Sequence, residues 1–401
     1  MRIVQINAVY GATSTGTITK DLHLLSLQEG IESYVVYSYT NQSVKNGYKM
    51  GSRIERKWHA LLSRINGAMG YFSHLSTIKL LRYLDKLSPD IIHLHNLHGC
   101  YIQLNMLLKY AAKKNISVVL TLHDCWFYTG GCYHYTFANC YKWKSECGHC
   151  PQRYSGTPAY LYDASHSILN DRKKYFGEIN NLHVVGVSQW IIDEAKQNVF
   201  KNKNCLKIYN GIDLNIFKPT KSNFKKDCGL ENKFIILGPA TKWLNPMNES
   251  ILRYVSENMS DDMVFIIFGV PSHKESIFAN VKYVSYIKDR QQLAALYSAA
   301  DVFINCTKEE SLSLINVEAQ ACGTPVITYR NTGVQETIDG VSGFSVENGD
   351  VEKMMSYIMQ IYKHGKTKYS QYCIEWVKSN FEMNKNYKEY IKLYKEINNN
   401  R

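Results

Sequence analysis

The 401-residue sequence lacks several features that mark common classes of protein. No apolar run reaches the roughly 18 residues that a membrane-spanning helix needs. The first residues, MRIVQINAVYG, lack the apolar core and cleavage site of a signal peptide and are typical of a strand. No G-x-G-x-x-G motif follows a strand, which disfavours a dinucleotide-dependent oxidoreductase. We therefore expect a cytoplasmic protein whose 11 cysteines are reduced or metal-bound.

Acidic residues are scarce in the first half of the chain. Residues 1–219 hold 25 Lys and Arg against 14 Asp and Glu, a net charge of +11, whereas residues 220–401 hold 22 and 21, a net charge of +1. A basic half favours an anionic partner. Because no nucleic-acid-binding motif appears, we expect a membrane surface or a pyrophosphate-linked acceptor, and no nucleic acid.

Patterns typical of strands and helices alternate along the chain in two series. The first series comprises strands at 2–11, 33–38, 89–96, 116–124, 183–188 and 206–213 with helices at 17–29, 103–114 and 189–198. The second series follows Pro219, with strands at 233–240, 263–269, 281–287, 300–306 and 324–329. Such alternation predicts parallel sheets covered by helices on both faces.

We therefore predict an α/β protein with two Rossmann-like domains whose parallel sheets face a central cleft. The N-terminal domain is expected at residues 1–217 and includes a Cys-rich loop at 130–151. The C-terminal domain is expected at 218–401, with its last helix crossing back to the N-terminal domain. Ligands of such sheets bind at the carboxyl ends of the strands, so the cleft is the expected active site.

Two acidic residues flank an expected helix start in TKEESLSLINVEAQACGTPVI, residues 307–327. Glu310 and Glu318 have seven residues between them, and helical geometry would place them near one face about two turns apart. Glu310 is expected at or before the helix start, with free backbone N–H groups at 311–314 that suit phosphate or sugar oxygens. The alternative is an acid favoured near a helix N-terminus and an ordinary surface glutamate.

Three weaker signals lie where first-half strands end. The loop GATSTG, residues 11–16, could hold a phosphate on backbone N–H groups or be a tight turn, and no Walker lysine follows it. His123 and Asp124 are expected at a strand end, where His123 contacts a sugar or is a structural histidine. His93 and His95 share one strand face, which makes a metal pair conceivable, although no third ligand is evident.

Four cysteines, Cys132, Cys140, Cys147 and Cys150, lie within 19 residues of an aromatic loop. Their spacing, C-x7-C-x6-C-x2-C, is sufficient for a closed structural zinc site that would stabilise the loop. Independent thiols are nearly as well supported, and disulfides are least favoured because of the expected compartment.

Residues 52–84 combine basic and apolar side chains at helical spacing. The basic residues are Arg53, Arg56, Lys57 and Arg64, and the apolar ones are Trp58, Leu61, Leu62 and Ile65. A basic amphipathic helix can lie on an anionic membrane. A helix packed on its own domain with solvated charges is the alternative.

Taken together, these segments resemble the retaining glycosyltransferases of family 4, which have the GT-B fold, and in particular bacterial enzymes of colanic acid, capsule and O-antigen synthesis. The resemblance spans nearly the whole chain. Its specific motif is the E-x7-E of EESLSLINVEAQACGTPVITYRNTGVQETI, and weaker ones are QINAVYGATSTG, PDIIHLHNLHGCYI, LTLHDCWFYTGGC, KWKSECGHCPQ, VGVSQW and IYNGIDLNIFKP.

The resemblance implies a role for particular residues. Glu310 would contact the donor sugar hydroxyls, and Glu318 would accept two hydrogen bonds from the ribose diol. Gly16 would approach the diphosphate, and His123 would touch the sugar near the reacting carbon. The remaining donor contacts would come from Lys242, Ile287 beside the base, and the backbone of Ser311, Leu312, Ser313 and Leu314.

One departure from the family pattern stands in KWLNPMNES. Relatives carry an Arg–Lys–Gly sequence after the first strand of the second domain, and here Pro246 and Met247 occupy the basic positions and Asn248 replaces the glycine. Losing cations that face a leaving diphosphate costs on the order of 10³-fold per contact. Lys242 or Lys308 could substitute. The alternative is a catalytically weak or inactive homologue that acts as a binding partner of another transferase.

The resemblance also implies the reaction. A sugar would move from a UDP- or GDP-sugar to a lipid-linked saccharide acceptor with retention of configuration, the leaving phosphate taking the acceptor proton. No cofactor is required for this chemistry, so zinc would have a structural role only. We expect a cytoplasmic location, peripheral on the inner face of the cytoplasmic membrane.

Overall fold

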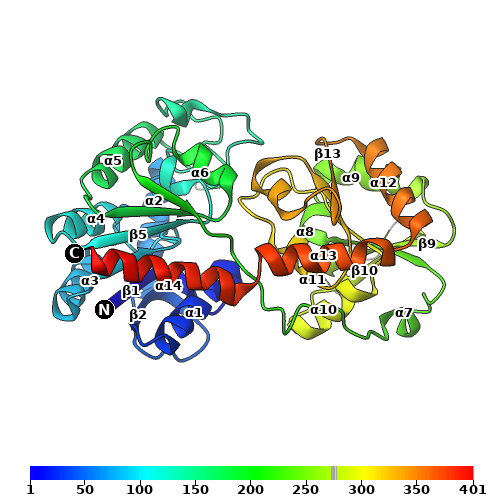
Figure 1. Ribbon diagram of the computed structural model, residues 1–401. Coiled ribbons are helices and arrows are strands. Elements are labelled where there is room, and N and C mark those ends of the chain that lie inside the picture. Colours follow the sequence, from blue (N-terminus) through cyan, green and yellow to red (C-terminus); the bar gives the residue numbers. More distant parts are fainter. Residues whose placement is uncertain (157, 272–275, 277, 401) are drawn as a thin grey trace. The chain divides into compact units, whose positions relative to one another are not determined.

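The computed structural model describes residues 1–156, 158–271, 276 and 278–400, and it divides the chain into two compact units (Figure 1). Unit 1 comprises Met1–Ile208 and Tyr387–Arg401, and unit 2 comprises Tyr209–Asn386. The division falls after Ile208, earlier in the chain than the boundary after residue 217 that the sequence predicted. The physical reason is that Ile212 and Phe217 are buried in the apolar core of unit 2.

Unit 1 is built on a seven-stranded parallel sheet in the order β3-β2-β1-β4-β5-β6-β7. The strands are β1 (Arg2–Tyr10), β2 (Glu32–Thr40), β3 (Gly47–Lys49), β4 (Ile91–Leu94), β5 (Ser117–Leu122), β6 (Leu182–Gly186) and β7 (Asn204–Lys207). The central strands are buried on both faces, as in β5, whose six residues SVVLTL are all buried. Such continuous apolar runs are typical of parallel sheets.

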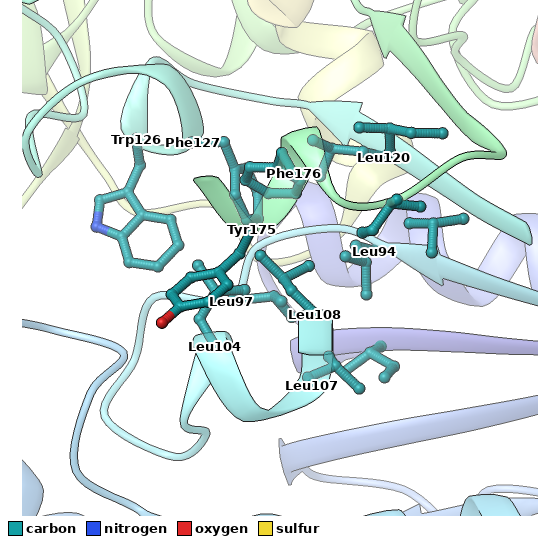
Figure 2. Close-up of a cluster of buried hydrophobic side chains, with 14 of the residues drawn as sticks. Leu94, Leu97, Leu104, Leu107, Leu108, Leu120, Trp126, Phe127, Tyr175 and Phe176 are labelled. Carbon is teal, nitrogen blue, oxygen red and sulfur yellow. The ribbon is translucent and has the colours of Figure 1, made fainter. Parts of the chain in front are cut away.

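The helices of unit 1 cover the sheet and complete its core. They are α1 (Thr13–Gln28), α2 (Arg53–Asn66), α3 (His74–Leu87), α4 (Leu104–Lys113), α5 (Ser165–Gly177) and α6 (Gln189–Ala195), with 3-10 turns at Trp126–Tyr128 and Lys142–Lys144. Figure 2 shows leucines of β4, α4 and β5 packed with aromatic side chains of the 3-10 turn and α5. Burial of this cluster is the main source of stability for the unit.

Unit 2 has a six-stranded parallel sheet in the order β10-β9-β8-β11-β12-β13. Its strands are β8 (Phe234–Pro239), β9 (Met263–Val270), β10 (Val281–Ser285), β11 (Val302–Asn305), β12 (Val326–Tyr329) and β13 (Gly343–Val346). Its helices are α7 (Phe224–Asp227), α8 (Ala240–Trp243), α9 (Glu249–Glu257), α10 (Arg290–Ala299), α11 (Leu314–Ala321), α12 (Val351–His364) and α13 (Thr367–Asn380), with 3-10 turns at Pro246–Asn248 and Thr332–Thr337. The sheet orders of both units are those of Rossmann-like folds, which confirms the predicted fold class.

The C-terminal helix α14 (Met383–Asn399) begins in unit 2, and its residues from Tyr387 onward belong to unit 1. Figure 1 shows it in red along the N-terminal part of the fold. Its Tyr390 and Tyr394 are fully buried in unit 1, where they hydrogen bond to side chains on β4 and β5. A polar contact of this kind holds the end of the chain on a sheet formed some 300 residues earlier.

The region 52–84 forms two helices rather than one. Helix α2 starts after Ser52, whose hydroxyl accepts from the Glu55 backbone N–H, and stops at Gly67 in the left-handed region at φ 75°. Glycine adopts this conformation without a Cβ penalty, which makes it a common helix stop. The short strands β3 and β13 were not predicted. No helix within the described ranges is both long and apolar enough to cross a membrane.

Candidate functional site

A charged pair lies beyond the carboxyl end of the unit 2 sheet. Lys242, on the short helix α8 that follows β8, donates from Nζ to Glu310 Oε1 at 2.8 Å and to Thr307 Oγ1 at 2.9 Å. Both charged side chains are about a quarter exposed. The second carboxylate oxygen, Glu310 Oε2, is buried and has no hydrogen-bond partner among the described residues. The site therefore offers one half-satisfied carboxylate beside one ammonium group.

Buried amide and hydroxyl groups hold the loop that carries Glu310. Asn305, the last residue of β11, donates from Nδ2 to Ser313 Oγ and to Asn316 Oδ1, both at 2.9 Å. Asn316 in turn donates to Thr337 Oγ1 at 3.0 Å. On the other side Thr332 Oγ1 donates to the Glu310 carbonyl at 2.7 Å. Sequence reasoning missed Asn305, Asn316, Thr332 and Thr337, although polar side chains inside an apolar strand and helix were a usable signal.

Glu310 and Glu318 occupy different structural elements. Helix α11 begins at Leu314, so Glu310 lies in the loop before it and Glu318 within it, as predicted. The eight-residue spacing is therefore not helical, and the expectation that both carboxylates lie on one helix face is wrong. The helix also starts later than expected, so the N–H groups of 311–313 belong to the loop and only that of Leu314 belongs to the helix.

Glu318 lies in an environment that favours its neutral form. Tyr297, fully buried on α10, donates its hydroxyl to Glu318 Oε2 at 3.3 Å. Desolvation raises the pKa of Glu318 to about 7, although nearby Arg290 and the Tyr297 hydroxyl lower it in part. A carboxylate in this state exchanges a proton near neutral pH. It can therefore pair with a hydroxyl-rich ligand at the cost of losing that proton.

The positions expected to carry basic residues form a 3-10 turn, Pro246–Asn248, with Met247 half exposed. Asn248 donates from Nδ2 to the Lys242 carbonyl at 2.8 Å, which fastens this turn to α8. Lys242 is thus the cation that contacts Glu310. Ile287 follows β10 and packs, with Leu312 and Leu314, at the edge of the same apolar cluster as Tyr297.

His123 directly follows β5 in unit 1 and, itself half-buried, adjoins the fully buried His93 and His95, with which it forms a row of histidines. His95 Nδ1 lies 3.2 Å from His123 Nε2, and His95 Nε2 lies 3.1 Å from the Gln5 side-chain oxygen Oε1. The His93 and His95 rings are tilted by 37° with centroids 4.0 Å apart, and the His95 and His123 rings are stacked with centroids 5.5 Å apart. Burial lowers the pKa of all three, to about 4 for His123. At neutral pH these rings are uncharged.

Asp124, which neighbours this row, and His93, within it, form hydrogen bonds with residues other than His123. Asp124 accepts from His98 Nε2 at 2.9 Å and from the Trp126 backbone N–H at 2.9 Å, so it pairs with His98 rather than with His123. His93 has Tyr394 on one ring nitrogen at 2.6 Å and Thr121 on the other at 2.8 Å. Because both nitrogens of His93 and of His95 are occupied, a metal pair at these residues is not formed.

The first loop of unit 1 is shorter than the sequence suggested. Helix α1 begins at Thr13, so Gly16 lies in its first turn and not in a loop. Gly11 has φ 70° and donates its N–H to the Gly16 carbonyl at 2.8 Å. A Cβ at Gly16 would lie 3.1 Å from the Val9 carbonyl oxygen, so a larger residue would disturb the end of β1. The diphosphate contact of Gly16 stays a prediction.

The four loop cysteines are all half-buried free thiols. Cys132 and Cys150 are hydrogen-bonded to each other, which lowers the pKa of Cys150 to about 7 and raises that of Cys132. Throughout the described parts of the chain, no three or more His, Cys, Asp or Glu side chains are grouped as metal ligands would be. Zinc at Cys132, Cys140, Cys147 and Cys150 stays a prediction for elemental analysis.

Helix α2 presents its apolar stripe to solvent. Its buried residues are His59 and Ser63, and His59 accepts from the Gly70 backbone N–H at 3.1 Å and contacts Ser73 Oγ at 2.7 Å. Ile54, Trp58 and Leu61 are 70%, 60% and 53% exposed, whereas Leu62 and Ile65 are half-buried. The helix thus leaves part of its apolar side in solvent, where an ordinary surface helix buries that side.

The surface beside this stripe is also apolar and basic. Leu161, 73% exposed, lies at the end of α2 because its N–H donates to the Ile65 carbonyl at 2.9 Å, and exposed Tyr160 and Tyr162 flank it. Of the predicted basic residues, Arg53, Lys57 and Arg64 are exposed. Arg56 is not, because its guanidinium turns to Ser38 Oγ at 3.1 Å. We call Ile54, Trp58, Leu61 and Leu161 with these three basic residues the α2 surface.

Two family models match consecutive parts of the chain. Residues 27–216, almost entirely in unit 1, match the model described as Glycosyltransferase Family 4. Residues 232–364, in unit 2, match the model described as Glycosyl transferases group 1. Each model therefore coincides with one of the two structural units.

Known proteins are similar over nearly the full length. The putative colanic acid biosynthesis glycosyl transferase WcaC of Escherichia coli (strain K12) is 24% identical over 382 residues, 88% of this chain and 89% of the relative. Sucrose-phosphate synthase from Thermosynechococcus elongatus aligns with a TM-score of 0.70 at 16% identity, covering 100% of both chains. Anabaena Alr3699/HepE, solved in complex with UDP, aligns with a TM-score of 0.68 at 15% identity, covering 99% of this chain and 100% of that chain.

Proposed function

Because the chain belongs to the group 1 and family 4 glycosyltransferases and has the two-unit GT-B fold, we propose that it is a retaining hexosyltransferase of bacterial surface polysaccharide synthesis. The donor is a UDP- or GDP-sugar and the acceptor a lipid-linked or free saccharide. Support for the donor class comes from the HepE structures, which hold UDP and UDP-glucose. Support for the pathway, with capsule and O-antigen as further settings, comes from the colanic acid relative.

The observation that carries this proposal is the Lys242–Glu310 pair at the end of the unit 2 sheet. Glu310 Oε2 is a buried acceptor with no partner in the described structure, and an unpaired buried acceptor costs about 1–3 kcal/mol. A donor sugar hydroxyl at Oε2 would remove that cost. Lys242, whose Nζ lies 2.8 Å from Glu310 Oε1, supplies positive charge for the diphosphate, and Glu318 accepts from the ribose diol.

The proposed reaction takes place on one face of the donor sugar. The bond between the anomeric carbon and the diphosphate oxygen breaks, and the acceptor hydroxyl oxygen bonds to that carbon from the same face. The hydroxyl proton passes to the leaving phosphate, so no protein base is consumed. Lys242 stabilises the negative charge that develops on the diphosphate, which is where a preorganised cation contributes most.

A donor screen tests the proposal directly. Thermal shift with UDP, GDP and their hexoses should raise the Tm for one nucleotide class, by an amount that grows with ligand concentration. Turnover of that donor with a membrane-extracted acceptor should follow, and product anomeric configuration by NMR should match the donor. Transfer with inversion would exclude the retaining mechanism. If no sugar nucleotide raises the Tm, the proposed enzyme class is wrong.

A second function is favoured by Pro246 and Met247, which leave the diphosphate region with fewer cations than the family pattern has. Under this alternative the chain binds a sugar nucleotide and acts as the partner of another transferase. It predicts donor binding without turnover in isolation, and turnover by a second transferase that rises when this chain is added. Turnover by the purified chain alone would exclude it.

The proposed acceptor is lipid-linked, and the α2 surface is the proposed site of membrane contact on the inner face of the cytoplasmic membrane. Its exposed apolar side chains match the acyl boundary, and Arg53, Lys57 and Arg64 match anionic headgroups. Each basic residue near such a surface contributes about 1 kcal/mol. Changing all three to Gln should therefore weaken binding to vesicles of phosphatidylglycerol and phosphatidylethanolamine by more than tenfold.

A matched control separates this surface from total charge. Changing Lys113, Lys196 and Lys201 to Gln removes three exposed charges from other parts of unit 1. That variant should keep vesicle binding within about twofold at 0.15 M salt, since its charges lie away from the bilayer. Trp58→Ser should weaken binding to neutral vesicles as well. Equal losses in both triple variants would contradict a specific membrane face.

A further inference from the structure

A chain of hydrogen bonds runs from β1 to the residue after β5 in unit 1. The Gln5 carbonyl oxygen Oε1 can only accept, so His95 Nε2, 3.1 Å away, is the protonated nitrogen of that ring. His95 is buried and uncharged, so its other nitrogen, Nδ1, is a lone pair. His95 Nδ1 must then accept from His123 Nε2, at 3.2 Å. The proton of His123 is therefore on Nε2.

The same bonds define the other nitrogen of His123. A neutral imidazole carries one proton, so Nδ1 of His123 is a lone pair. Nδ1 is buried and has no hydrogen-bond partner in the residues that the structure describes. An unpaired buried acceptor is unfavourable until a donor reaches it. A sugar hydroxyl is a donor of suitable size and neutral charge.

The outer end of the row is anchored by the C-terminal helix. His93, whose ring centroid lies 4.0 Å from that of His95, is bonded through Nδ1 to Tyr394 at 2.6 Å and through Nε2 to Thr121 at 2.8 Å. Thr121 also contacts the Tyr390 hydroxyl at 3.1 Å. Helix α14 thus fixes His93, whose ring limits the tilt of His95.

We infer that Gln5 and His95 are positioning residues that hold His123 as a neutral imidazole with its proton on Nε2 and a lone pair on Nδ1, ready to accept from a hydroxyl of the transferred sugar. The inference rests on the proposed function for its ligand. A neutral ring suits the proposed reaction because an imidazolium would repel the positive charge that develops on the anomeric carbon. His93 and Tyr394 support this arrangement without touching the sugar.

Nitrogen-15 NMR of the histidine rings tests the tautomer without any donor. His123 and His95 should both show a protonated Nε2 and an unprotonated Nδ1, with assignments from His123→Gln and His95→Gln. A protonated Nδ1 on His123 would overturn the inference. This result does not depend on sugar-nucleotide binding, so it can stand even if the proposed function fails.

Kinetics then test the consequence. Gln5→Met removes the acceptor at similar volume and should lower kcat about tenfold with the donor KM unchanged, since the lost contact acts in the transition state. Gln5→Glu keeps an acceptor oxygen at the same place and should restore most of kcat. A fall of kcat in both variants, or in neither, would contradict the role of Gln5.

A second buried histidine supplies the control for folding. His23 has both ring nitrogens bonded, to Ser33 Oγ at 2.8 Å and the Lys45 carbonyl at 3.2 Å, and does not belong to the row. His23→Gln and His95→Gln should lower the Tm alike, but only His95→Gln should lower kcat. If both lower kcat equally at a temperature where both are folded, His95 is structural and the inference is wrong.

Discussion

The strand ends of the two units carry opposite kinds of polar site. In unit 1 the residues after β4 and β5 are neutral histidines, the buried His95 and the half-buried His123, which are joined to each other and, through His95, to Gln5. In unit 2 the residues after β8 and β11 are a lysine and a glutamate, charged and about a quarter exposed. Burial decides this difference, because desolvation removes charge unless a counter-ion is in contact. Unit 2 is thus suited to an anionic nucleotide and unit 1 to uncharged hydroxyl groups.

The largest effect is expected at the carboxylate of unit 2. Glu310→Gln keeps the shape of the side chain. It removes the negative charge opposite Lys242 and the carboxylate oxygen that would accept a hydrogen bond from the donor sugar. We expect kcat/KM to fall about 10³-fold, the size of one lost transition-state contact, while the free nucleotide still binds. Steady-state kinetics and thermal shift with the nucleotide check this. Glu352→Gln, at an exposed position on α12, is the control. Activity above a tenth of wild type would exclude Glu310 from the reaction.

A smaller loss should follow removal of the cation. Lys242→Met should lower kcat about 10²-fold, because the diphosphate loses its proposed positive partner in unit 2. Met247→Lys restores a cation at one of the two positions where this chain departs from the basic residues of the family pattern. It should raise kcat severalfold in the wild-type background. Lys282→Met, at an exposed position on β10, is the control and should leave kcat unchanged. If Met247→Lys abolishes activity, a cation at this position does not help the reaction, and the turn Pro246–Asn248 has another role.

Glu318 should make nucleotide binding depend on pH in a range where the neutral histidines do not. The carboxylate must ionise to accept from the ribose, and its pKa is raised to about 7. Affinity should therefore fall up to tenfold per pH unit below 7. Isothermal titration between pH 5.5 and 8.5 checks this, and Glu318→Gln should flatten the profile. A flat wild-type profile would remove Glu318 from the ribose contact.

The same group predicts a stability change of known sign. Its folded pKa, about 7, lies above the ordinary glutamate pKa of 4.5, so the folded state binds the proton more tightly. Its contribution to stability is therefore complete below pH 4.5 and is lost as the pH rises through 7. The Tm of Glu318→Gln minus that of wild type should therefore increase between pH 5 and 8. A constant difference would show that Glu318 does not titrate in this range.

The smallest effect is expected from the outermost support of unit 1. Tyr394→Phe leaves His93 Nδ1 without its partner in the interior, and we expect a loss of about 1–2 kcal/mol in the free energy of unfolding. Urea denaturation measures it. Tyr372→Phe, at a half-exposed position on α13, is the matched control and should stay within about 0.5 kcal/mol of wild type. No destabilisation at Tyr394 would mean that α14 is held by apolar contact alone.

Much of the fold followed from local pattern. The buried strands β5, β8 and β9 were predicted from continuous apolar runs, because strands covered on both faces need no polar residues. The short strands β3 and β13 were missed because they contain only three and four residues, too few to show a strand pattern. The boundaries of α1 and α11 were displaced because neither start has a side-chain cap that a sequence could reveal.

The candidate site was predicted less completely than the fold. Glu310, Glu318 and His123 were identified by motif. Lys242 and His95 were also named, but for other roles, and Tyr297 was not named. Their contacts with the three motif residues were not predicted, because these partners lie on other strands and helices. The α2 surface was identified as basic and amphipathic. Its orientation could not be read, since a helical stripe looks the same whether it faces a core or solvent.

The sequence by itself determined the alternation of strands and helices, the basic first half, the family and the motif residues, because each depends on residue type and local spacing. Only the tertiary structure decided which groups are charged and which are neutral. Burial and contact partners set those states, and they join residues as distant as Gln5 and His95, or Lys242 and Glu310. The same packing left Ile54, Trp58 and Leu61 exposed, a choice that no local pattern encodes.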